Sequence, residues 1–201
     1  MEQPPETPAN DPQDPRHEAE RDNPRPQIYI ASLADYSAGR LHGAWVDAAQ
    51  EPDELAADAD AILKTSSEPW AEEYAIHDYE GFGPLRLGEY ESLETVSLIA
   101  NGIAEHGPAF AHWAALIEER TPEELDRFDE AYLGHHDTVV DYAETMLDDL
   151  GVTSELEAAV PEGLRAYVRI DIEMLARDMQ LSLELMTSEG DGGVYIFQGG
   201  W

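Results

Sequence analysis

The sequence predicts an α+β protein built from several small domains. Short β-prone runs alternate along the chain with segments whose apolar residues recur at helical spacing. Glycine and proline separate these segments at short intervals, so no long element builds one deep core. We expect folded domains at residues 27–86, 87–131 and 132–201, after a tail at residues 1–26.

The tail differs sharply in composition from the rest of the 201 residues. Residues 1–26 hold 7 of the 13 prolines and contain no Val, Ile, Leu, Phe, Trp or Tyr. Such a segment buries too little apolar surface to offset its ordering entropy, which predicts disorder. Seven acids and three arginines give the tail a charge of −4, so −29 of the total −33 belongs to residues 27–201.

The first domain is predicted to be a small α/β unit. Strands are expected at Ile28–Ile30, at Leu41–Val46 and around Tyr74–Ile76, and a helix begins at Pro52. The turn-rich sequence GFGP at 81–84 closes the domain. We expect its core to contain Ile28, Ile30, Trp45, Tyr74 and Ile76.

The middle domain is predicted to be helical. Ser92 caps a helix that ends at Gly107, and Pro108 begins the next helix. Thr121 and Glu124 form a capping box with proline at the first helical position, which indicates a third helix start.

The last domain is predicted to mix helices and strands. Thr138 caps a helix that Gly151 ends, a second helix covers 171–180, and strands cover 164–170 and 194–197. Its beginning also matches an earlier stretch. Residues 87–93 and 133–139 share the order leucine, glycine, variable, aromatic or histidine, acid, hydroxyl, aliphatic. This match fits either a duplication or a coincidence between two helix starts of the same residue pattern.

The charge excludes several classes of function. The 44 acids against 11 basic residues repel nucleic acid and anionic lipid, both of which need clustered Lys and Arg. No apolar run approaches the roughly 18 residues of a membrane span, and the first residues do not resemble a signal peptide. Together with the absence of cysteine, these features favour a cytoplasmic protein.

The residue patterns of catalytic and metal sites are missing from the sequence. His135, His136 and Asp137 are adjacent, but neighbours on an extended segment point apart and no third ligand follows at helical spacing. There is no nucleophile elbow, no zinc-protease motif and no phosphate-binding glycine loop. We therefore expect no enzyme activity, no metal and no cofactor.

The acids themselves are the candidate site. Residues 118–149 alone contain twelve acids and two arginines, and such like charges oppose compact folding unless their field is useful or screened. We expect four motif acids in loops and the others in exposed rows on helices. The four loop acids are Asp35, Asp47, Asp78 and Glu80. The complete predicted surface is Asp35, Asp47, Asp53, Glu54, Asp58, Asp60, Asp78, Glu80, Glu118, Glu119, Glu123, Glu124, Asp126, Asp129, Glu130, Asp137, Asp141, Glu144, Asp148 and Asp149.

Three explanations of this charge compete. Halophilic adaptation would coat a globular protein that has an unassigned small-molecule or protein-binding role. A histone-binding or nucleoid-binding acidic chaperone is a weaker option. The third is DNA mimicry: at one charge per roughly 1.7 Å of duplex, 29 charges correspond to roughly 50 Å, or about 15 base pairs.

Three stretches carry a resemblance to a known family. IYIASLADYSAGRLHGAWVDA (28–48), EEYAIHDYEGFG (72–83) and YLGHHDTVVDYAE (132–144) resemble, in this order, the signature stretches of ArdA-type antirestriction proteins. The resemblance covers about 28–201 and leaves the tail outside.

The resemblance implies a protein of a mobile genetic element that inhibits type I restriction-modification enzymes by mimicking B-form DNA. It implies an elongated row of three small domains and a homodimer formed through about 132–201. The implied target is the methyltransferase core, with its specificity and modification subunits, and inhibition by occupancy of the DNA-binding channel rather than by catalysis.

Overall fold

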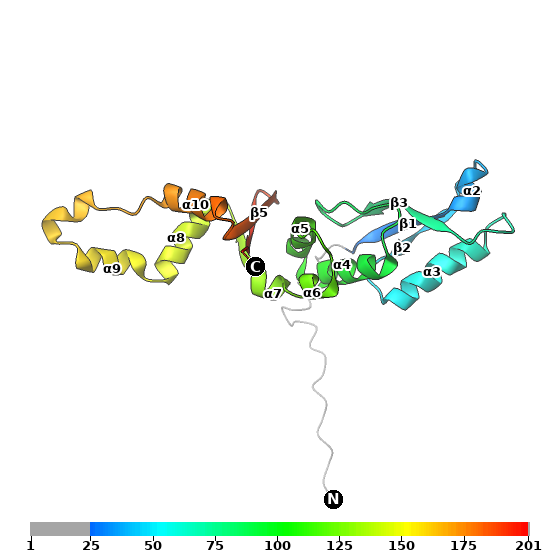
Figure 1. Cartoon of the computed structure of the whole chain (residues 1–201), viewed down its shortest axis with the longest axis horizontal. Coiled ribbons are helices and arrows are strands. Elements are labelled where there is room, and N and C mark those ends of the chain that lie inside the picture. Colours follow the sequence, from blue (N-terminus) through cyan, green and yellow to red (C-terminus); the bar gives the residue numbers. More distant parts are fainter. Residues whose placement is uncertain (1–24, 201) are drawn as a thin grey trace, which may run out of the picture. The chain divides into compact units, whose positions relative to one another are not determined.

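The computed structural model of the protein describes residues 25–200, which form two compact units. The first unit ends at Ala111 and the second begins at His112. Each combines helices with a small antiparallel sheet, which confirms the mixed α and β prediction (Figure 1). The division into three domains stays a prediction, and the predicted tail lies outside the described residues except for its last two.

The first unit contains the three strands that the sequence predicts. β1 (Gln27–Ser32) lies between β2 (Gly43–Asp47) and β3 (Tyr74–Glu80), and both pairings are antiparallel. The short helix α2 (Leu33–Ser37) follows β1 directly, because the Ser32 hydroxyl accepts a hydrogen bond from the Asp35 N–H at 3.3 Å.

Helices cover one face of this sheet. α3 (Pro52–Lys64) packs on β1 and β2, and α4 (Leu93–His106) packs on α3 (Figure 1). The predicted cap of α4 is confirmed, since the Ser92 hydroxyl accepts from the Thr95 N–H at 3.1 Å.

The residues predicted for the first core fall on both faces of the sheet. Ile28, Ile30 and Ile76 are buried, as expected. Trp45 was predicted to be buried and is 44% exposed. It lies opposite Tyr29 in the register, on the face that alternates away from Ile28 and Ile30, so the helices do not cover it.

Helices α5 (Pro108–Leu116), α6 (Pro122–Leu125) and α7 (Phe128–Ala131) follow. The predicted capping of α6 is confirmed by the Glu124 N–H, which donates to the Thr121 hydroxyl at 3.3 Å. The helix is a single turn all the same, because the chain turns at Asp126 and Arg127 before α7 begins.

The second unit is built around a sheet of order β4-β6-β5, with β4 (Tyr132–His136), β5 (Leu185–Gly190) and β6 (Gly193–Gln198). Of these strands the sequence predicts only β6. Helices α8 (Val139–Asp149) and α10 (Ile172–Leu181) pack against it, and the Thr138 and Asp171 caps are both present. One buried cluster of this unit consists of Ala143, Ala176, Met179, Leu185, Val194 and Ile196.

The strand predicted at 164–170 is wrong. After α9 (Val152–Ala159) the chain forms a 3₁₀ helix, η1 (Glu162–Tyr167), and reaches α10 through an irregular segment drawn as an open loop in Figure 1. Every residue from 161 to 169 is exposed, and no strand of the described chain lies beside the segment to pair with it. Alternating apolar residues alone do not make a strand without a sheet edge to join.

Within residues 25–200 no helix is both long and apolar enough to cross a membrane.

Candidate functional site

Acidic side chains dominate the exposed surface of both units. Residues 25–200 contain 37 acids and 9 basic residues, and 31 of those acids are exposed. Sixteen of the twenty predicted site residues are among them. We call these sixteen the acidic surface: Asp53, Glu54, Asp60, Asp78, Glu80, Glu118, Glu119, Glu123, Asp126, Asp129, Glu130, Asp137, Asp141, Glu144, Asp148 and Asp149. Asp47, Asp58 and Glu124 are half-buried.

The prediction that Asp35 belongs to an accessible surface is wrong. Its side chain lies in α2, not in a loop, and is fully buried. The carboxylate accepts hydrogen bonds from Arg40 Nε and Nη2, both at 3.3 Å, from the Ser67 hydroxyl at 3.2 Å and from the Ser66 hydroxyl. These donors explain why a buried acid is tolerated, and they leave it no face for a partner.

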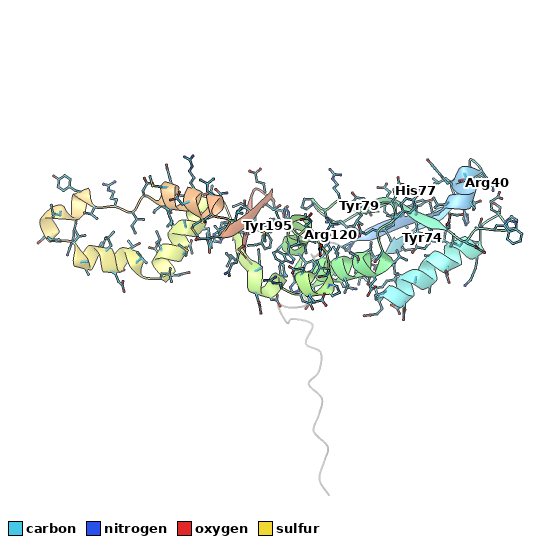
Figure 2. All side chains as sticks on the ribbon, viewed as in Figure 1. Arg40, Tyr74, His77, Tyr79, Arg120 and Tyr195 are labelled. Atoms are coloured by element: carbon cyan, nitrogen blue, oxygen red, sulfur yellow. The ribbon has the colours of Figure 1, made fainter. Side chains whose placement is uncertain are left out.

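The bonds to Asp35 also set its protonation. The hydrogen bond from Ser66 is the largest cause that lowers the pKa of Asp35, to about 2, against burial, which raises it. The guanidinium of Arg40 (Figure 2) contacts Glu68 as well as Asp35, and these contacts raise the pKa of Arg40. The group ties α2 to the segment 66–68, so its role is structural.

Sequence reasoning could not find this cluster from the acid itself. Ser66 and Ser67 lie more than thirty residues after Asp35, in a segment that was not singled out. Arg40, five residues after Asp35, was the one visible signal, because a basic residue so close to an acid offers it a partner.

The other three motif acids belong to strands. Asp78 and Glu80 lie in β3, where loops were predicted, and both are exposed. Asp47 ends β2; it pairs with Arg25 at 3.5 Å and accepts a hydrogen bond from the Ala49 N–H at 2.9 Å. Asp47 therefore has a local capping role in addition to its charge.

The acids on α3 share one helix but differ in their surroundings. Asp53 and Glu54 occupy the first turn, where negative charge is favoured by the helix dipole. Asp58 accepts a hydrogen bond from the Gln50 amide at 2.9 Å, and Asp60 lies 4.0 Å from Lys64.

The acids between 118 and 149 follow short elements of the second unit. They lie before and on α6 and α7, after β4, and along α8. Two of them bond to neighbouring side chains: Glu124 pairs with Arg127 at 3.4 Å, and Asp141 accepts from the Thr138 hydroxyl at 2.6 Å. The remaining acids of this stretch are exposed to solvent.

The histidines of the second unit form a packed cluster. The ring of His112 is buried, stacks on Tyr195 with ring centroids 4.2 Å apart, and lies 2.7 Å from the Ser188 hydroxyl through Nδ1. Burial lowers the pKa of His112. His135 packs on Tyr195 at 4.4 Å between centroids. The described chain contains no group of three or more His, Asp or Glu side chains that could hold a metal ion.

Residues 28–192 match the model of the family described as Antirestriction protein (ArdA). The chain belongs to the ArdA family. ArdA proteins are inhibitors and not enzymes, and the family implies an antirestriction function exerted on restriction-modification enzymes. A search of curated proteins found no match.

Proposed function

We propose that this ArdA protein mimics B-form DNA and competitively occupies the DNA-binding channel of type I restriction-modification enzymes. The observation that carries the proposal is the exposure of 31 acids over both units, against 9 basic residues in the same 176 positions. A DNA-binding channel is lined with Lys and Arg that neutralise phosphates. Carboxylates held on a folded scaffold offer that channel the same sign of charge without a cleavable or modifiable backbone.

The scarcity of cations strengthens the outward field. Four basic residues, Arg25, Arg40, Lys64 and Arg127, already form ion pairs with neighbouring acids. The excess of 28 negative charges on residues 25–200 (37 acids minus 9 cations) is therefore available to long-range attraction. Electrostatic steering of this kind speeds association and is weakened by salt.

The acids act together in this mechanism. Contacts between exposed charges are individually weak, and those more than about 10 Å apart contribute nearly independently. Affinity for the methyltransferase core, with its specificity and modification subunits, then arises from many small contributions, and no single acid is indispensable.

A homodimer formed through the C-terminal part completes the proposal. Among residues 25–200, seven of the twelve exposed large apolar side chains fall within residues 150–183. One of them, Val168, lines an open pocket of about 420 Å³ formed by α8, α9 and the segment up to Ile172. Large exposed apolar areas mark interfaces. The seven are Leu150, Leu164, Tyr167, Val168, Met174, Leu181 and Leu183.

The test is displacement of DNA from a purified type I methyltransferase. The protein should release a fluorescent duplex carrying the recognition site, with an apparent affinity that falls steeply as NaCl rises from 50 to 300 mM. Light scattering on the purified protein alone should give the mass of a dimer. If the duplex stays bound at 50 mM NaCl with the protein in excess, mimicry is refuted. Unfolding of the protein in that dilute buffer, reversed by molar salt, would favour halophilic adaptation instead.

A further inference from the structure

We propose that the uncovered face of the sheet in the first unit binds arginine side chains of the restriction-modification enzyme. The proposal rests on the proposed function and specifies the chemistry of one contact. We call this surface the aromatic face: Gln27, Tyr29, Trp45, Asp47, Asp78 and Glu80.

The strand register places these six residues on one side of the sheet. Tyr29 of β1 lies between Trp45 of β2 and Asp78 of β3, which gives one cross-strand row. Gln27 lies between Asp47 and Glu80, which gives a second row two residues further along β1. Since α3 packs on β1 and β2 at the opposite face, both rows lie on the face that this helix leaves open.

The rings of Tyr29 and Trp45 pack against each other beside Gly43 of β2. The rings of Tyr29 and Trp45 meet edge to face, with centroids 5.7 Å apart. A Cβ atom at Gly43 would lie 2.9 Å from Tyr29 Cε1 and 2.4 Å from the Ile30 carbonyl oxygen. Gly43 therefore gives the Tyr29 ring room to lie across the strand, beside a tryptophan that stays 44% exposed.

The acids of the aromatic face differ in how much of their charge is free. Arg25 pairs with Asp47 at 3.5 Å, so the charge of Asp47 is partly neutralised. Asp78 accepts a hydrogen bond from the Tyr79 N–H at 2.9 Å, and Glu80 is exposed. Among residues 25–200, neither Asp78 nor Glu80 takes part in an ion pair. Two negative charges and two aromatic rings thus share one face of the sheet.

Arginine is the side chain that uses both features. Its planar guanidinium stacks on aromatic rings and at the same time donates paired hydrogen bonds to a carboxylate. Direct cross-strand neighbours are about 5 Å apart, so a guanidinium over Tyr29, which lies between Trp45 and Asp78, is within reach of Asp78. The DNA-binding surface of the enzyme supplies arginines for this contact, because it binds phosphates.

This contact differs from the rest of the acidic surface in its response to salt. Exposed charge pairs are screened at high ionic strength, whereas stacking on an aromatic ring is screened less. The aromatic face should then provide a part of the binding that persists when NaCl is raised.

The test compares the variant Trp45→Ala with the control variant Trp70→Ala. Trp70 is 83% exposed and lies outside the sheet. Binding to the methyltransferase is measured at 50 and 300 mM NaCl. We expect Trp45→Ala to weaken binding about tenfold or more at both salt concentrations, as anchor aromatics do, and Trp70→Ala to stay within about twofold of wild type. Trp45→Phe, which keeps a ring, should restore part of the loss.

The double variant Asp78→Asn/Glu80→Gln carries the test if Trp45→Ala lowers the melting temperature, and it should weaken binding at 50 mM NaCl. Equal affinities of Trp45→Ala and Trp70→Ala, with wild type still displacing DNA, would overturn the inference and leave mimicry intact. Loss of the dimer in Trp45→Ala would also overturn it, since a second copy would then cover the face. No binding by wild type would instead refute the proposed function.

Discussion

Removing charge from one stretch of the acidic surface tests whether occupancy is distributed electrostatics. Four exposed acids around α6 are suited to this: Glu118, Glu119, Glu123 and Asp126. We consider their simultaneous replacement by Gln or Asn, which changes the charge of residues 25–200 from −28 to −24. A matched control exchanges Asp and Glu at the same four positions, so that shape changes and charge does not.

The expected size of the effect follows from exposure. An exposed charge pair contributes about 0.2–1 kcal/mol, so losing four costs about 0.8–4 kcal/mol of binding free energy. At about 1.4 kcal/mol per decade, affinity for the methyltransferase falls between about fourfold and several hundredfold at 50 mM NaCl. The difference from wild type should shrink at 300 mM NaCl, because salt screens the charges that were removed.

The assay is competition against a fluorescent duplex, with thermal unfolding of each variant as a check on folding. Surface substitutions of this kind change stability little, and removing like charges relieves repulsion. An affinity within twofold of wild type at 50 mM NaCl would refute the reasoning. So would an equal loss in the charge-preserving control, because the contact would then depend on shape.

Three further outcomes concern the fold. Ile196→Ala should lower the free energy of unfolding of the second unit by about 2–5 kcal/mol in a denaturant titration, because this side chain of β6 is fully buried in the cluster with Ala143 and Leu185. Gly190→Ala should cost about 1–3 kcal/mol, since the new Cβ would lie 2.5 Å from His112 Cε1, whereas Gly163→Ala, with open space around it, serves as the near-neutral control. Asp35→Asn should lower the melting temperature at pH 7. The pKa of Asp35 in the folded protein is about 2, below its ordinary 3.8, so the stabilisation by this carboxylate is complete above about pH 4 and disappears as the pH falls towards 2. A difference in melting temperature between variant and wild type that stays constant over this pH range would contradict the assignment.

Local signals in the sequence predicted local structure well. The caps at Ser92, Thr121 and Thr138 each accept the hydrogen bond expected of them, because capping depends on residues three positions apart. The strands of the first unit were predicted for a similar reason: β1 and β3 are rich in β-branched and aromatic residues.

Features that depend on distant partners were missed. β4 and β5 become strands because β6 lies between them, and neither contains a strong apolar alternation of its own. The segment 164–170 has such an alternation and no edge to join, so it was wrongly predicted as a strand. Exposure followed the same rule: most acids face solvent as expected, but Asp35 is buried by serines thirty residues away and Trp45 is exposed by the pleat of β2.

The exposed segment 161–169 gives the second unit one vulnerable place. Trypsin cleaves after Lys and Arg, and this chain has only 11 such residues. Arg165 and Arg169 both lie in that run of nine exposed residues, whose regular structure is one short 3₁₀ helix. Digestion at this point reports directly on whether the apolar side chains beside it are covered. If two copies associate through this region, trypsin should cleave the segment slowly at micromolar protein and faster on dilution. The cleavage rate then measures the association of two copies without a label.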